Sequence, residues 1–259
     1  MLYLYGDESN TPGADKVWAI GFIFSANPNV HMKEIQRIRR ECSYKFRELK
    51  YSSTDYSQIL CAVRLTDYFL EASDLYFKII IKDSMFIDKE YFRDNFYKLN
   101  ERDMAYVSAY AELCKSIDPT KYGQHKKLLN IDDKGFKGNV ILPSFLKQKD
   151  ATITQVFRRD SKKRSKTGYF TGVSSMIQLA DFLTGVVLSF ADSKTERTKK
   201  SEKHKNIYRK ALLSKCVGAQ NKLSNKTNYY WPSFRYQKIN VFYWKQKASL
   251  GKSPGRSRR

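Results

Sequence analysis

The chain has 259 residues, 41% hydrophobic and 14% aromatic, and carries 48 Lys and Arg against 26 Asp and Glu, a formal net charge of +22. This length permits one large α/β domain or two small ones, and this composition excludes a chain that is disordered as a whole. No apolar run predicts a membrane span, and Met1 leads into a strand-like run without the features of a signal peptide, so we expect a cytoplasmic protein with no membrane partner.

The first part of the chain alternates between strand and helix patterns. The predicted elements are strands at 2–5 and 17–25, a helix at 32–42, a short strand or loop at 46–52, a helix at 56–72 and a buried strand at 75–81. The turn-rich residues 10–15 predict that the first two strands pair as a hairpin.

The second part continues this alternation. Its predicted elements are a long helix at 90–116, a strand at 127–131, a short helix at 140–147, a strand at 151–158, an apolar helix at 174–190, a charged connector at 192–205, a helix at 207–217 and strand-like residues at 229–245. This order predicts an α/β fold with a mixed sheet, antiparallel in its first part and parallel in its second. We divide the chain into a domain at 1–192, an extension at 193–247 that packs on it and includes a closing strand, and a disordered basic tail at 248–259.

The four cysteines are scattered and form no metal-binding pair. They are Cys42, Cys61, Cys114 and Cys216, and no two of them have the spacing of a zinc motif. We therefore expect free thiols rather than disulfides or zinc ligands.

The excess of positive charge favours a nucleic-acid partner, because contacts to phosphate supply most of such affinity. The basic residues gather in short runs, and those that we expect to contact a phosphate backbone are Arg158, Arg159, Lys162, Lys163, Arg164, Lys199 and Lys200. The alternative is a solvated basic surface that binds nothing.

Three carboxylates occupy positions where apolar residues are expected. Asp7 follows the first strand, Asp132 follows the strand at 127–131, and Asp181 lies inside the apolar helix on the same face as Gln178. Sites in open α/β sheets lie beyond the carboxyl ends of parallel strands, so we expect these carboxylates to converge. Such a group could hold two divalent cations for phosphodiester cleavage.

Each carboxylate also has an ordinary structural interpretation. An Asp after a strand is often a turn or helix-cap residue, and Asp133 can fill that role beside Asp132. Asp181 alternatively pairs with a buried arginine. Asp83 and Asp160 have the same cap-like placement, and we rank them below the other carboxylates.

Four segments resemble the DUF3800 family: Tyr5–Ser9 with the strand that follows, Glu48–Lys50, the strand that closes on Asp132, and Ile177–Gly185. The first motif departs from the family at Asn10, where glycine is usual. The resemblance implies an RNase H-like fold, a mixed sheet flanked by helices, and a metal-dependent nuclease. It further implies that Mg²⁺ or Mn²⁺ is bound by Asp7, Glu48, Asp132 and Asp181, with Asp7 bridging two ions and Glu8 as a further candidate.

These observations predict a nuclease that cleaves phosphodiester bonds of DNA or RNA with two metal ions, in a bacterial defence or mobile-element system, with nucleic acid and a possible protein partner in a larger complex. A non-catalytic nucleic-acid-binding or adaptor subunit with the same fold is the alternative. A polynucleotide transferase or integrase uses the same metal chemistry, and the sequence does not separate it from a nuclease.

Overall fold

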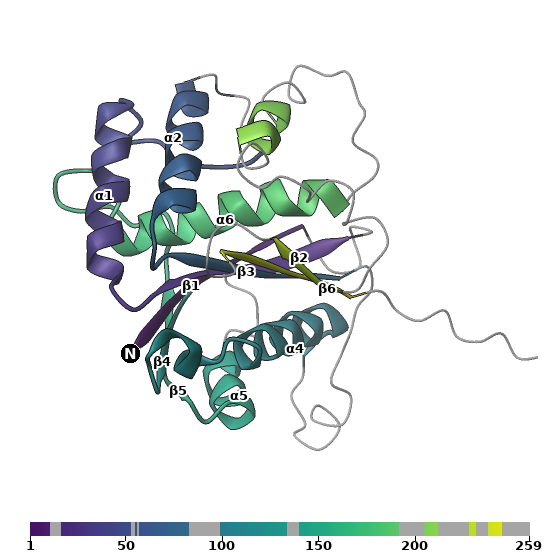
Figure 1. Cartoon of the computed structure of the whole chain (residues 1–259). Coiled ribbons are helices and arrows are strands. Elements are labelled where there is room, and N and C mark those ends of the chain that lie inside the picture. The colour runs from purple at the N-terminus through teal and green to yellow at the C-terminus, as the bar shows by residue number, and fades with distance from the viewer. Residues whose placement is uncertain are drawn as a thin grey trace, which may run out of the picture.

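The computed structural model shows a seven-stranded sheet between two layers of helices (Figure 1). It describes residues 1–10, 17–52, 55, 57–82, 99–133, 140–191, 205–211, 228–231 and 238–244. The strands are β1 (Leu2–Ser9), β2 (Trp18–Ser25), β3 (Tyr76–Lys82), β4 (Lys127–Asp132), β5 (Ile153–Arg159), β6 (Asn228–Trp231) and β7 (Ile239–Trp244). Their order in the sheet is β5-β4-β1-β2-β3-β7-β6.

The direction of the strands brings three carboxyl ends to one edge of the sheet. Strand β1 pairs with β2 as an antiparallel hairpin and with β4 in parallel, and β4 pairs in parallel with β5. The predicted mixed sheet, antiparallel first and parallel afterwards, is therefore confirmed. The carboxyl ends of β1, β4 and β5 lie together, which is where α/β proteins place their sites.

The helices divide between the two faces of the sheet. The elements are α1 (Pro28–Glu41), α2 (Ser57–Glu71), α4 (Glu101–Lys115), α5 (Leu142–Lys149), α6 (Gly172–Ala191) and a short 3₁₀ helix, η1 (Pro119–Tyr122). Helices α1, α2 and α6 cover one face, and α4 and α5 cover the other (Figure 1). Residues 205–211 are also helical.

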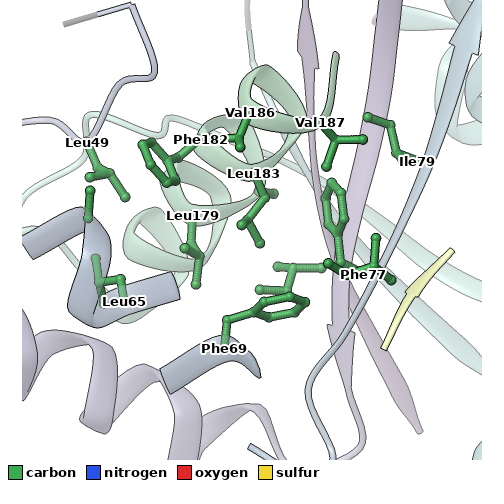
Figure 2. Packing of buried hydrophobic residues seen from close by; sticks show 14 of the residues in the cluster. Leu49, Leu65, Phe69, Phe77, Ile79, Leu179, Phe182, Leu183, Val186 and Val187 are labelled. Carbon is green, nitrogen blue, oxygen red and sulfur yellow. The ribbon is translucent and has the colours of Figure 1, made fainter. Parts of the chain in front are cut away.

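Helix α6 is the centre of the larger hydrophobic core. Leu179, Leu183 and Val187 extend from it toward side chains of α2 and β3 (Figure 2). An 18-residue window of α6 is apolar enough for a membrane span by composition, but 83% of that window is buried inside the protein. Because most of it is buried, α6 is a core helix. Burial of each such aliphatic side chain contributes about 1.5–3 kcal/mol to the stability of the fold.

A glycine permits α6 to approach the sheet beside Asp7. Gly21 of β2 pairs with Asp7, and a Cβ atom built on Gly21 would lie 2.1 Å from the Thr184 hydroxyl oxygen of α6. A larger residue at 21 would therefore clash with the Thr184 side chain and with the ring of Phe77, which lies 2.8 Å from the same position. Because Asp181 lies one helical turn before Thr184, this close contact positions Asp181 over the end of β1.

The structure differs from the sequence predictions at several boundaries. Residues 46–52 form turns and irregular chain rather than a strand. The helix predicted at 90–116 begins at Glu101, after residues 99 and 100 that are not helical, and its earlier part lies outside the described residues. Asn10, where the family motif has glycine, adopts φ = 63°, a conformation that asparagine tolerates better than most residues.

Some predictions fall on residues that the structure does not describe. They concern residues 192–204 of the connector predicted at 192–205, residues 212–217 of the helix predicted at 207–217, residues 232–237 and 245 of the strand-like segment, the tail at 248–259, Asp83, Lys199, Lys200 and Cys216. Cys42, Cys61 and Cys114 are free thiols, as predicted. Strand β7 pairs with β3 in the main sheet, whereas the division into domains stays a prediction.

The start of α4 gives a prediction for stability. The Asn100 side chain caps the helix by accepting a hydrogen bond from the backbone N–H of Asp103 at 2.8 Å. We expect Asn100→Ala to lower the free energy of unfolding by about 1 kcal/mol, because that N–H loses its partner. Urea denaturation measures the change. Lys33→Ala, at an exposed position of α1, should change it by less than about 0.5 kcal/mol; equal effects would contradict the capping role.

Candidate active site

A cavity of about 540 Å³ opens at the carboxyl ends of β1 and β4. Its lining contains six carboxylates, two lysines and one serine: Asp7, Glu48, Asp132, Asp133, Asp160, Asp181, Lys50, Lys162 and Ser161. We call it the carboxylate cavity. All four residues that the sequence predicts as metal ligands line it, although they come from two strands, an irregular segment and a helix.

Asp7 and Asp132 lie beside each other on neighbouring strands. Gly6 pairs with Ile131 in the parallel ladder, so the next residue of each strand is an aspartate. Strand alternation places both carboxylates on the face that α6 covers. They are 3% and 7% exposed, respectively. Buried carboxylates so close together repel each other, and their charge favours a bound cation.

Glu8 lies on the opposite face of the sheet. Its carboxylate accepts a hydrogen bond from the Tyr110 hydroxyl of α4 at 2.9 Å, and Glu8 does not line the carboxylate cavity. Burial raises the pKa of Tyr110 well above its usual value, and the negative charges of Glu8, Asp7 and Asp132 raise it further. The end of β1 therefore carries negative charge on both faces of the sheet.

The other carboxylates are held by local contacts. Asp132 accepts a hydrogen bond from the backbone N–H of Ser161 at 2.8 Å. Glu48 forms an ion pair with Lys50 at 3.2 Å. Asp160, for which the sequence predicts a cap, accepts a hydrogen bond from the backbone N–H of Lys162 at 2.7 Å within a turn, and it also lines the cavity.

A buried glutamine of α6 joins three parts of the site. Gln178 is 1% exposed, and its Oε1 accepts hydrogen bonds from Arg39 Nη1 at 2.7 Å and from the backbone N–H of Leu49 at 3.2 Å. Its Nε2 donates to the carbonyl of Ser161 at 2.7 Å. Because Ser161 in turn donates to Asp132, one side chain positions the residues next to both Glu48 and Asp132.

A second buried glutamine fixes the other end of the segment that carries Glu48. The Gln58 side chain of α2 accepts a hydrogen bond from the backbone N–H of Lys50 at 2.9 Å and donates one to the Lys50 carbonyl at 2.7 Å. The Tyr44 hydroxyl donates to the Glu48 carbonyl at 3.1 Å. Leu49 is 1% exposed and packs in the core beside α6 (Figure 2). Side chains thus provide the hydrogen bonds to this irregular backbone that a helix or strand would otherwise provide, and they orient Glu48 toward the cavity.

The predicted basic run at 158–164 does not form one surface. Strand alternation places Arg158 on the face of Val156, which packs with α4 and α5, away from the carboxylate cavity. Arg159 donates to the side-chain oxygen of Asn130 at 3.3 Å. Arg164 donates to the carbonyl of Phe46 at 2.8 Å.

The two lysines of this run are exposed, and Lys162 lines the carboxylate cavity. Of the basic residues in this run, Lys162 is the one that lines the carboxylate cavity.

The donor set fits a hard divalent cation by its chemistry. Six carboxylates offer the oxygen ligands that Mg²⁺ and Mn²⁺ prefer, and the cavity contains no sulfur or imidazole ligand. Within the described part of the chain, no three acidic, histidine or cysteine side chains are grouped closely enough to hold one ion directly. Mg²⁺ usually keeps several waters and takes only one or two carboxylates, so the donor set remains suitable.

Several residues of the site were not predicted from the sequence. Lys50 and Ser161 line the cavity, and Gln58 and Arg39 support the segment that carries Glu48. Two signals were available: Gln58 lies on the apolar side of its helix, and Arg39 follows Ile38 on the buried side of α1. A polar residue in a core stripe is retained when it makes hydrogen bonds there.

No family model matches the chain, and no curated protein matches it. Among solved structures, the chain is similar to RNase HII of Archaeoglobus fulgidus, solved as a complex with PCNA, with 10% identity, a TM-score of 0.42, and coverage of 88% of this chain and 98% of that chain. It is also similar to ribonuclease H2 of Pyrococcus horikoshii, with 11% identity, a TM-score of 0.38, and coverage of 81% and 100%.

Proposed function

We propose that this protein is a metal-dependent nuclease that cleaves phosphodiester bonds of DNA or RNA. The observation that carries the proposal is the carboxylate cavity, which gathers six of the 26 acidic residues of a chain whose net charge is +22. A cluster of like charges destabilises a protein unless cations neutralise it. A basic protein with one acidic cavity can attract a polyanion and still hold metal ions.

Asp7, Glu48, Asp132 and Asp181 would hold the metal ions. When bound, Mg²⁺ or Mn²⁺ activates water and stabilises the leaving oxygen of a phosphodiester. The protein itself orients the carboxylates: the strand ends position Asp7 and Asp132, and the close contact of α6 with β2 positions Asp181. Lys50 and Lys162 at the cavity supply positive charge toward substrate phosphates.

The direct test is incubation of the purified protein with labelled DNA and RNA, single- and double-stranded, in Mg²⁺, Mn²⁺ or EDTA. We expect cleavage of at least one of these substrates with a divalent ion and none in EDTA. Binding of nucleic acid without cleavage under any of these conditions would favour the adaptor alternative. Joined strands among the products would favour a transferase.

Neutralising the two exposed lysines gives a prediction for substrate binding. In Lys162→Gln/Lys163→Gln, we expect weaker binding of nucleic acid and a slope of log K against log salt that is flatter by about 1.4–1.8, because two phosphate contacts are lost. Titration of a labelled oligonucleotide at several salt concentrations measures both. Arg158→Gln is the matched control, since Arg158 lies on the other face of the sheet, and it should leave the slope unchanged. An equal effect of Arg158→Gln would show that only net charge matters.

A further inference from the structure

A second, basic cavity of about 230 Å³ forms between α1 and the start of α6. Its walls come from α1, from Lys45 and from residues 165–175, and its lining includes Arg39 and Arg40 but no carboxylate. Gln178 connects the two cavities, because it accepts a hydrogen bond from Arg39 and donates one to Ser161 of the carboxylate cavity. We call it the basic cavity.

The buried guanidinium of Arg39 makes no hydrogen bond to an anion among the described residues. Arg39 is 2% exposed and donates only to neutral oxygens, the side chain of Gln178 and the carbonyl of Arg47. In the described part of the chain its Nε has no hydrogen-bond partner, and Glu48, whose negative charge acts on Arg39, forms its ion pair with Lys50 instead. Phe170 lies under the guanidinium, with the ring centroid 4.8 Å away. A buried cation without a counterion costs free energy, which a bound anion would offset.

The first turn of α6 contributes a second buried donor without a partner. Ser175 lines the basic cavity, is 1% exposed, and its hydroxyl oxygen has no hydrogen-bond partner in the described part of the chain. The N-terminus of a long helix also favours a negative charge through its free N–H groups and its dipole. Arg39 and Ser175 are thus two independent orphaned groups that line one cavity.

We propose that the basic cavity binds a phosphate monoester, the terminal phosphate of a nucleic-acid strand, and thereby anchors a strand end beside the carboxylate cavity. This inference rests on the proposed function and specifies its substrate. A terminal phosphate carries nearly two negative charges near neutral pH, whereas an internal phosphodiester carries one. The three cationic side chains of the basic cavity, with no carboxylate beside them, match the charge of a terminal phosphate better than that of a phosphodiester.

The surroundings suit the rest of a terminal nucleotide. Tyr169 stacks on Phe46 with ring centroids 5.1 Å apart, and Lys45 Nζ lies 5.2 Å from both rings. Tyr169 lines the basic cavity and offers a flat surface for a base or a sugar. From Ser175 to Asp181 the helix rises by about 9 Å, which equals the axial rise of two to three nucleotides of one strand at about 3.4 Å each.

The test is binding of a short labelled oligonucleotide in EDTA, with a 5′-phosphate, with a 3′-phosphate, or with hydroxyls at both ends. We expect one phosphorylated form to bind about tenfold more tightly than the hydroxyl form, as for one charge-assisted contact. Equal binding of the three forms would overturn the inference. The inference would also be overturned if a mononucleotide or inorganic phosphate bound as tightly as the phosphorylated strand, because the cavity would then be a site for a small free ligand.

Variants locate the preference. Arg40→Gln and Ser175→Ala should each reduce the preference for the terminal phosphate several-fold, while Lys33→Gln, which removes one exposed charge from the same helix outside the cavity, should preserve it. A preference that survives both cavity variants would contradict the assignment. Because the binding assay contains no metal, its result is independent of cleavage. If the wild type cleaves but shows no preference for a terminal phosphate, this inference alone is refuted. If it shows the preference but does not cleave, only the proposed nuclease activity is refuted.

Discussion

Asp7→Asn and Asp132→Asn should each reduce metal-dependent cleavage by a factor of about 10³ or more. The two carboxylates are buried side by side at the ends of β1 and β4, and we propose that they hold the metal ions. Loss of such a ligand removes several kcal/mol of transition-state stabilisation, at about 1.4 kcal/mol for each factor of ten. Initial rates of cleavage of the preferred labelled substrate measure the effect.

The same variants should remain folded, because each removes one of several like charges. In EDTA we expect a melting temperature equal to or above that of the wild type, since less repulsion remains. Glu101→Gln, at an exposed position of α4, is the control for loss of one negative charge and should cleave normally. Full activity of Asp7→Asn would exclude the proposed role of the carboxylate cavity.

Gln178→Leu should lower both the stability and the activity. The substitution leaves Arg39 Nη1, the N–H of Leu49 and the carbonyl of Ser161 without their partner inside the protein. Each buried unsatisfied group costs about 1–3 kcal/mol, so we expect a loss of at least about 3 kcal/mol in the free energy of unfolding. Cleavage should fall further than the folded fraction, because Gln178 positions the residues beside Glu48 and Asp132.

A conservative variant separates positioning from mere stability. Gln178→Glu keeps the acceptor for Arg39 and Leu49 but loses the donor to Ser161, so the segment of Glu48 should stay in place. We expect it to recover stability relative to Gln178→Leu and to recover part of the activity, measured at a temperature where both variants are folded. If Gln178→Leu, once folded, cleaves at the wild-type rate, Gln178 supports the fold only.

Much of the site could be predicted from the sequence because it follows regular elements. Strand alternation and the position of Asp7 and Asp132 at strand ends predict that they meet, and the helical period predicts that Gln178 and Asp181 share a face. Strand alternation also predicts that the basic run is divided between the two faces of the sheet, because Arg158 and Arg159 are neighbours on β5 and must face opposite sides.

Glu48 could not be placed by periodicity. Its segment forms neither helix nor strand, and side chains from Tyr44, Gln58 and Gln178 hold its backbone. Gln58 lies on α2 and Gln178 on α6, so the pattern of residues around Glu48 does not indicate these contacts. Only the resemblance to a family indicated Glu48. The basic cavity was likewise not predicted, because it forms where α1 meets the start of α6.

The most direct measurement of the central proposal is calorimetric titration of Mn²⁺ into the metal-free protein, which does not require the substrate to be known. We predict saturable binding to the wild type that is lost or strongly weakened in Asp7→Asn and in Asp132→Asn and is unchanged in Glu101→Gln. Absence of binding to the wild type, or equal binding to the wild type and to both aspartate variants, would contradict a metal site in the carboxylate cavity.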